Sequence, residues 1–419
     1  MNAAMEDRAN SLLLTEELID GWASTQSDTV ALHLKQKLLP VEGEGGVIFP
    51  PTYADIGYNI DTLSDGTRVA TIDSVGSQAN RLEPLFKSTG KDENGRERNS
   101  LAELVPQIEI ELHSKGEGSE KHIESRSLLD LAHRSADAVV QASPSLAKLV
   151  SPAFLALHRH GDAGPLCALA PTSLVFGVWD SRGETGEKRP RLIRSIIRAW
   201  NVEPLFAAAQ FNSTWKSLDE EQQEALQTEA KAKKVRLSEK GFADAPATFR
   251  KVSQSAAKHM TEFRNGSPNA ERRVLGGVIA RGPIERNVTI NLVALRAIRG
   301  ELPRSDERQE VSAETLRRYL LALALLAGTR DHDLFLREGC HLRYGDADSW
   351  YAVPRRGHNR LVDLASENAR SMILKYATRQ AVPLSTHWPK GNDISHRFDL
   401  KAAKKLIARK EADDQSDAV

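Results

Sequence analysis

The 419-residue sequence predicts an α+β fold, and three kinds of pattern support this prediction. Ile108, Ile110 and Leu112 alternate with glutamates, which is the period-two pattern of a half-buried strand. The run that follows Ser312 has apolar residues at helical spacing up to Ala327. Short apolar runs bounded by glycine and proline, such as residues 47–49, predict further strands.

Length and composition exclude several classes of protein. With 40% apolar and 27% charged residues, the chain has the composition of a globular protein of one large domain or two to three ordinary ones. Its two cysteines have no metal-type spacing, so we expect neither a disulfide framework nor a thiolate zinc site. The longest apolar run, residues 319–327, is too short for a membrane helix. With no leader-like N-terminus, these observations favour a cytoplasmic protein.

The first part of the chain predicts a helical segment followed by strands. Residues 1–45 form the expected N-terminal helical segment, because Val30, Leu34 and Leu38 have helix-like spacing before Pro40. Strands are expected at 47–49 and 67–73. A turn with Ser77 as the predicted helix cap follows.

The middle and the end of the chain predict a mixture of helices, strands and loops. We expect an exposed loop at 88–100, a helix at 128–140, a central strand at 167–179 and a solvated helix at 218–240. Residues 274–280 predict a strand and 288–298 a helix. Ser312 is the expected cap of a helix that Gly328 ends. Residues 346–419 are assigned to a C-terminal extension with a frayed acidic tail.

Conventional catalytic motifs are absent from the sequence. It has no phosphate-binding glycine loop, no dinucleotide fingerprint, no H-E-x-x-H and no G-x-S-x-G. We therefore expect no enzyme activity, no cofactor and no metal. The best metal candidate is the string formed by His158, His160 and Asp162, which lacks companion ligands, and Asp331–Asp333 is interpreted as a polar loop around His332.

The basic residues are more informative than the balanced total of 57 basic and 57 acidic residues. Between Ser181 and Ala199, six basic residues stand against two acidic ones. If Pro190 starts a helix, Arg191, Arg194 and Arg198 share one face of it. Arginine suits phosphate because its planar fork makes bidentate contacts. The candidate nucleic-acid-binding residues of this stretch are Arg182, Arg189, Arg191, Arg194 and Arg198.

Two further turns carry hydrogen-bond donors. Arg281 and Arg286 are placed between a predicted strand and a predicted helix, where a helix N-terminus favours phosphate. The turn after the 67–73 strand offers Ser77, Gln78, Asn80 and Arg81. Three such turns together indicate contact with a nucleic-acid backbone.

Three strings of the sequence give a resemblance to a known family. They are DSVGSQANRLE at 73–83, SLVFGVWDSR at 173–182, and LGGV at 275–278 with NLVAL at 291–295. Together they resemble the CRISPR-associated RAMP-superfamily backbone subunit of type I-U (I-G) Cascade-type interference complexes, over about residues 45 to 345.

The resemblance implies a modified RRM/ferredoxin-like (RAMP) core at 46–345 with large helical and hairpin insertions. Family members carry a thumb hairpin, for which residues 88–126 and 244–273 both qualify. The implied function is to bind CRISPR guide RNA by its backbone, with contacts at Ser77, Gln78 and Arg81, and to polymerise along it. Asn80 is added on physical grounds as a neighbouring donor. The implied partners are guide RNA, target DNA in the assembled complex, copies of the same chain, other Cascade subunits and a helicase-nuclease.

Two other interpretations remain open from the sequence. One is a RAMP-type or metal-dependent ribonuclease that processes CRISPR RNA with His158, His160 and Asp162 or with His332. The other is a structural scaffold whose arginines pair internally with carboxylates. Cleavage of repeat RNA distinguishes the first, and protein that purifies free of nucleic acid distinguishes the second.

Overall fold

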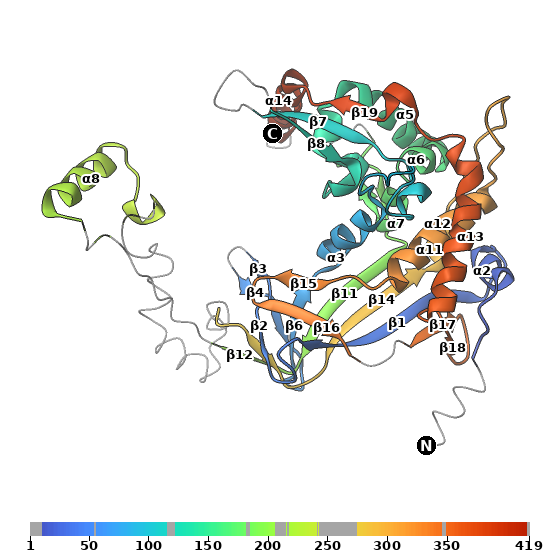
Figure 1. Cartoon of the computed structure of the whole chain (residues 1–419), viewed down its shortest axis with the longest axis horizontal. Helices are drawn as coiled ribbons and strands as arrows, with labels where there is room; N and C mark the ends of the chain where they lie inside the picture. Colours follow the sequence, from blue (N-terminus) through green and yellow to red (C-terminus); the bar gives the residue numbers. More distant parts are fainter. Residues whose placement is uncertain are drawn as a thin grey trace.

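The structure, a computed structural model, is an α+β fold built on one curled antiparallel sheet (Figure 1). It describes residues 11–53, 56–114, 122–181, 185–205, 215, 218–240, 242, 275–345 and 349–416. Along the main path of the sheet lie β15 (Leu334–Arg337), β16 (Cys340–Tyr344), β1 (Thr29–Pro40), β14 (Ile284–Asn291), β11 (Ile193–Trp200), β6 (Arg68–Asp73) and β5 (Ile60–Thr62). β17 (Trp350–Pro354) pairs with the first half of β1 and with β18 (Arg360–Val362).

A ferredoxin-like core can be traced within this sheet. Its chain order is β1, α3 (Val75–Leu82), β11, β14, α12 (Ala313–Thr329) and β17, and its spatial strand order is β17-β1-β14-β11. α3 packs on β11, and α12 packs on β11 and β14, so both helices cover the same face. This arrangement confirms the predicted α+β class with an RRM-like core and insertions.

Alternation along the strands decides which side chains face the helices. Leu32, Leu34 and Leu38 of β1 are fully buried on the helix-covered face, which we call the inner face. The intervening residues lie on the opposite, outer face, where Lys35 and Lys37 are exposed. Two hydrophobic cores result, one between the sheet and α12 and one inside the curled end formed by β15, β16 and β6.

The helix predicted over residues 1–40 is wrong for its second half. Within the described residues this stretch holds α2 (Glu16–Ala23) and then β1. Val30, Leu34 and Leu38 are spaced by four residues, which is an even number, so the same spacing also fits one face of a strand. The 12-residue strand pairs with β14 along most of its length.

Two predictions in the middle of the chain are also wrong. The helix predicted at 128–140 is replaced by 3-10 turns at Leu128–Asp130 and Arg134–Ala136 and the short α4 (Ala138–Gln141). The strand predicted at 167–179 is α6 (Gly164–Leu169) and α7 (Pro171–Phe176), followed by β9 (Val178–Trp179). These helices are buried nearly all round, and an apolar run then does not separate helix from strand.

The helix predicted from Pro190 is wrong, because this segment is the central strand β11. The helix predicted at 288–298 is also wrong in its first half, where β14 continues to Asn291 before α11 (Leu292–Arg296). Residues 281–283 therefore connect β13 (Val278–Ala280), which pairs with β12, to β14, which pairs with β11. Among the described residues, the next helix after Arg281 begins only at Leu292, so no helix N-terminus lies beside it there.

Other predictions are confirmed. The strands at 47–49 and 67–73 are present as β2 (Val47–Ile48) and β6, and the alternating residues at 108–112 lead into β7 (Glu109–Ser114). Ser312 caps α12 through its bond with the Thr315 amide. The polar helix at 218–240 is present as α8 (Glu220–Ala232).

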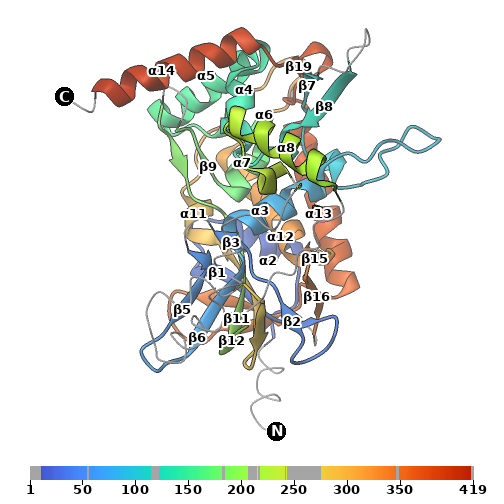
Figure 2. The same cartoon turned by 90° about the vertical axis from the view of Figure 1, so that its left-hand side faces the viewer.

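Many of the remaining elements form an upper layer on the side of the sheet that α3 covers (Figure 2). β7 pairs with β8 (His122–Ser127) and with β19 (Ser395–Arg397), next to α5 (Pro144–His160) and α14 (Leu400–Ser416). α13 (Glu367–Ser385) packs along α12. Smaller strands are β3 (Thr52–Tyr53), β4 (Gly57–Tyr58), β10 (Lys188–Arg189) and β12 (Val202–Pro204). No helix among the described residues is long and apolar enough to cross a membrane.

One insertion carries a helix of its own. It lies between β12 and β13 and carries α8, which stands apart from the remainder of the chain in Figure 1. The thumb candidate 244–273 falls outside the described residues. The other candidate, 88–126, includes an exposed loop and most of the β7–β8 pair, and the position of a thumb stays a prediction.

Candidate nucleic-acid interface

The predicted Ser77–Arg81 turn lies inside α3, which begins two residues earlier at Val75. Ser74 is the N-cap, and its Oγ accepts a hydrogen bond from the Ser77 amide at 3.2 Å. Ser77 was predicted to be this cap, but it lies inside the helix and its side chain is exposed. Asn80 is also exposed, whereas Gln78 is fully buried. Gln78 therefore does not present its amide outward as predicted.

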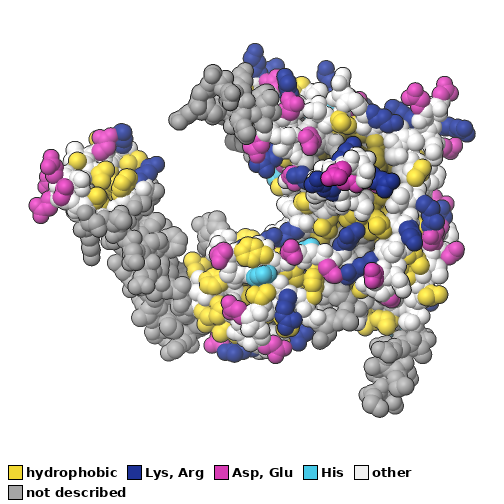
Figure 3. Space-filling view, viewed as in Figure 1, with side chains coloured by type: hydrophobic (Ala, Val, Ile, Leu, Met, Phe, Trp, Pro, Cys, Tyr) yellow, Lys and Arg dark blue, Asp and Glu magenta, His cyan; other side chains and the backbone are white. Residues whose placement is uncertain are grey.

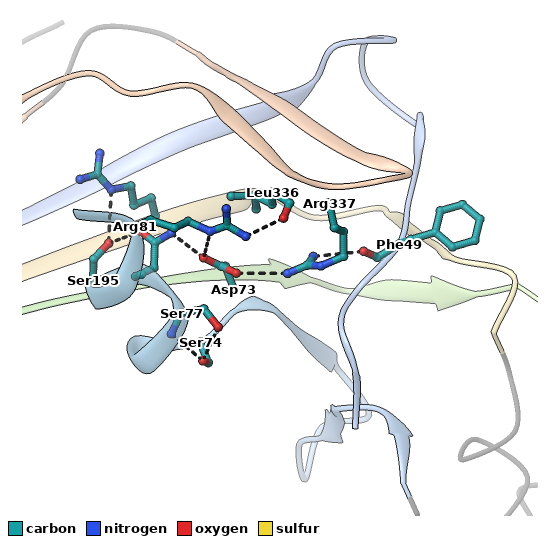
Figure 4. A network of polar contacts seen from close by, with 10 residues as sticks. Phe49, Asp73, Ser74, Ser77, Arg81, Ser195, Leu336 and Arg337 are labelled. Atoms are coloured by element: carbon teal, nitrogen blue, oxygen red, sulfur yellow. Dashed lines mark hydrogen bonds and ion pairs between the residues drawn. The ribbon is translucent and has the colours of Figure 1, made fainter. Parts of the chain in front are cut away.

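A buried carboxylate organises this corner (Figure 4). Asp73 at the end of β6 is fully buried and accepts from Gln78 Nε2 at 2.7 Å and from Arg81 Nε at 3.1 Å. Arg337 Nη2 of β15 donates to its other oxygen at 3.1 Å. Arg81 Nη2 also donates to the Leu336 carbonyl at 2.5 Å. The network thus fastens β15 to the start of α3.

Arg286 belongs to the inner face of the sheet. It is 1% exposed, and it donates to Ser195 Oγ at 3.3 Å and Gln36 Oε1 at 3.2 Å. Ser195 Oγ donates in turn to Gln78 Oε1 at 2.6 Å, which joins Arg286 to the Asp73 network. The exposed phosphate contact predicted for Arg286 therefore does not fit its position.

Two other candidate arginines have carboxylate partners. Arg189 pairs with Glu187 at 2.8 Å, and Arg281 pairs with Glu203 at 2.8 Å. Arg191 packs beside Gly177, where an added Cβ would lie 2.7 Å from the arginine Cγ. Arg182 lies outside the described residues. For Arg189 and Arg281 the carboxylate partners match the scaffold interpretation of the basic clusters.

Arg194 and Arg198 differ from those residues. They lie four residues apart on β11, so the strand places them on one face, as the helix interpretation also required. Register with β14 sets Arg194 opposite Thr289 and Arg198 opposite Glu285, on the outer face. Arg194 is exposed and Arg198 is half-buried. Within the described part of the chain, neither guanidinium has an ion-pair partner.

The sequence interpretation missed two lysines of the same face. In β1, Lys35 lies opposite Asn287 and Lys37 opposite Glu285 across β14. The Lys35 ammonium pairs with Glu285 at 2.8 Å, and that glutamate is only 7% exposed. A period-two pattern in the sequence could have predicted this strand and its outer face. In it, Lys35 and Lys37 alternate with Leu34, Gln36 and Leu38. Lys37 pairs with Glu44 at 3.3 Å, so the outer face carries four cations of which the two lysines have carboxylate partners.

A second buried ion pair fixes the exposed amide of Asn80. Glu83 and Arg134 are both buried, and Arg134 Nε lies 2.6 Å from Glu83 Oε2. Burial raises the pKa of Glu83 to about 7, against the opposing effect of Arg134. Arg134 has a φ of 56° and donates through Nη2 to Asn80 Oδ1 at 3.2 Å. Because arginine only donates, the Asn80 amide nitrogen is the atom left outward.

The candidate catalytic histidines do not come together with a metal-binding geometry. His158 and His160 lie in the last turn of α5, and His158 pairs with Glu187 at 3.0 Å. His332 follows α12, and burial together with Arg286 lowers its pKa to about 4. Among the described residues, no cluster of three or more His, Cys, Asp or Glu side chains could hold a metal ion.

The fold and these contacts define a ferredoxin-like α+β protein with an open, cation-bearing sheet face. Acidic and basic side chains are interspersed over the part of the surface seen in Figure 3. Residues 32–204, which run from β1 to β12, match the family model described as CRISPR-associated protein GSU0053. The match covers less than half of the chain and indicates a CRISPR-associated protein. No curated protein matches the sequence.

Proposed function

We propose that this protein binds CRISPR guide RNA through the RNA backbone and polymerises along it as the multi-copy spine of a type I interference complex. The family match supports a role in a CRISPR system. The observation that carries the RNA-binding part is the pair of cations on the outer face, Arg194 and Arg198, which lack carboxylate partners among the described residues.

The chemistry of this face suits a phosphate backbone. Arg194 and Arg198 project from a strand fixed on both edges by β14 and β6, so their spacing is set by the sheet. Guanidinium groups that are not neutralised within the protein can release counterions from RNA when they bind. Lys35 and Lys37 widen the same surface across β14. No pattern of base-reading side chains is needed, because pairing with the guide would read the target.

The exposed side of α3, which covers the inner face of the sheet, provides a second proposed contact. Ser77, Asn80 and Arg81 are the candidate guide contacts that remain at least partly exposed there. The Glu83–Arg134 pair holds Asn80 so that its amide nitrogen faces outward, and the Asp73 network holds Arg81. We propose that Gln78 supports this contact from inside.

The proposal includes no chemical step. We propose that the protein is a non-enzymatic component, whose partners are other copies of itself, the remaining Cascade subunits, target DNA and a helicase-nuclease. Incubation with repeat RNA, with and without a divalent metal, tests this directly. Cleavage that His158→Ala or His332→Ala abolishes would replace the proposal with the ribonuclease.

The decisive variant is Arg194→Glu combined with Arg198→Glu. We expect it to weaken binding of a single-stranded RNA by about tenfold or more. The slope of log affinity against log salt should fall by about 0.7 for each phosphate that the variant no longer neutralises. Fluorescence anisotropy over a salt series measures both quantities.

A matched control changes the same charge elsewhere. Arg304 and Arg308 are exposed in the loop before α12, and Arg304→Glu with Arg308→Glu should leave the salt slope unchanged. Equal effects of the two double variants would show that only net charge matters and would contradict a specific interface on the outer face.

A further inference from the structure

The outer face of the β15–β16 hairpin carries an exposed aromatic pair. Phe335 is 53% exposed and lies opposite His341 in the strand register. The two rings meet edge to face, with centroids 5.5 Å apart and planes at 90°. Their neighbours Leu334, Leu342 and Cys340 are buried on the inner face, so exposure of the pair follows from alternation along the strands.

We propose that Phe335 and His341 form a base-stacking subsite for single-stranded nucleic acid, a proposal that rests on the proposed RNA-binding function. An edge-to-face partner contacts one ring through its edge and leaves ring surface available. A nucleobase offers every protein a flat π-face, and stacking on an aromatic side chain is tolerant of sequence.

Charge around the pair favours nucleic acid over an apolar protein partner. Arg343 of β16 is exposed and lies two residues from His341, so the two side chains share the outer face. In the register with β1, Arg343 lies opposite Leu39. Two and four residues from Leu39 along β1, Lys37 and Lys35 continue this face and pair there with Glu44 and Glu285. Cations beside an exposed ring provide the phosphate contacts that accompany stacking in single-strand binding sites.

The hairpin is held in place by the buried network. The carbonyl of Leu336, next to Phe335, accepts from Arg81 Nη2, and Arg337 donates to Asp73 and to the Phe49 carbonyl. At the hairpin turn, Gly339 has a φ of 73° and packs against the Phe49 ring. Phe335 is therefore presented by a strand tied to α3, where Ser77 and Asn80 are exposed.

The test compares a base-bearing RNA with an abasic oligonucleotide of equal length and charge, using the full chain and fluorescence anisotropy. We expect Phe335→Ala to weaken binding of the RNA about tenfold and to leave abasic binding unchanged, while Phe335→Trp retains RNA binding. Val382→Ala, which truncates a similarly exposed apolar side chain on α13, should change neither.

The outcomes separate this subsite from the proposed function. If Phe335→Ala binds RNA as the wild type does while Arg194→Glu with Arg198→Glu binds both oligonucleotides more weakly, the subsite is wrong and the proposed function stands. If the wild type binds neither oligonucleotide, both are wrong. Should Phe335→Ala fail to fold, quenching of a 2-aminopurine base in RNA bound to the wild type decides, and unquenched fluorescence at every base position overturns the subsite.

Discussion

Asp73 shows how a single buried carboxylate can organise a binding corner. Its two oxygens receive Gln78, Arg81 and Arg337 from α3 and β15, and none of its side chain is exposed. Removing it leaves two guanidinium groups and an amide without their acceptor in a region of low dielectric. The residue is therefore a structural requirement for the surface that α3 and β15 present.

We predict that Asp73→Ala lowers the free energy of unfolding by about 3–5 kcal/mol, which is the usual cost of breaking a buried charge pair from one side. Urea unfolding followed by circular dichroism measures this loss. Glu203→Ala is the matched control, because its pair with Arg281 is exposed and should cost at most about 1 kcal/mol. Similar losses in the two variants would contradict the role assigned to Asp73.

His332 gives a pH dependence of known sign. Its pKa in the folded protein is lowered from 6.5 to about 4 by burial and by Arg286, so between these values the unfolded chain binds the proton and the folded chain does not. Acidification from pH 6.5 towards pH 4 should therefore favour unfolding through this residue.

The prediction is that His332→Gln loses less stability than the wild type as the pH falls through that window. Urea midpoints at pH 7, 6, 5 and 4.5 measure the difference between the two proteins, which removes the contributions of the carboxylates common to both. If the urea midpoints of the two proteins fall in parallel with pH, His332 contributes nothing to the pH dependence and the prediction is wrong.

At the scale of elements, the sequence predicts which side chains share a face better than it predicts whether a segment is a helix or a strand. Arg194 and Arg198 were placed on one face by a helical interpretation, and β11 keeps them together because four is also an even number. Ile196 lies on the outer face between the two arginines, whereas the polar Ser195 lies on the inner face, so the period-two signal is lost. Lys35 and Lys37 were missed because the helix assigned to β1 hid their alternation.

Helix capping was misassigned for a similar local reason. Both Ser74 and Ser77 precede helix-forming residues, and only the structure shows that α3 begins at Val75. We predict that Ser74→Ala destabilises the protein by about 1 kcal/mol, whereas Ser77→Ala costs clearly less. Thermal unfolding of the two variants makes the comparison, and a larger loss for Ser77→Ala would move the start of the helix.

At the scale of the whole molecule, contacts between residues far apart in the sequence determine which polar side chains are buried, and local patterns do not predict them. Arg81 reaches Leu336 and Asp73 reaches Arg337 across more than 250 positions, and no local spacing carries that information. Burial of Arg286 and Gln78 follows from the same closure of the curled sheet. The strings at 73–83 and 173–182 both fall within the part of the chain that matches the CRISPR-associated family, whereas the subtype and the backbone role rest on the resemblance and stay predictions.

The balanced charge of the chain suits the proposed assembly. With 57 basic and 57 acidic residues, neighbouring copies would not repel one another strongly, while local cations such as Arg194 remain available for RNA. A uniformly basic subunit would bind RNA but would oppose its own stacking.

The central claim is that several copies bind along one guide. Native mass spectrometry of the protein with single-stranded RNAs of increasing length tests it most directly. The account predicts that the number of bound copies rises in steps with RNA length, and that Arg194→Glu with Arg198→Glu lowers it at every length. A single bound copy on every RNA, or none, would contradict the account.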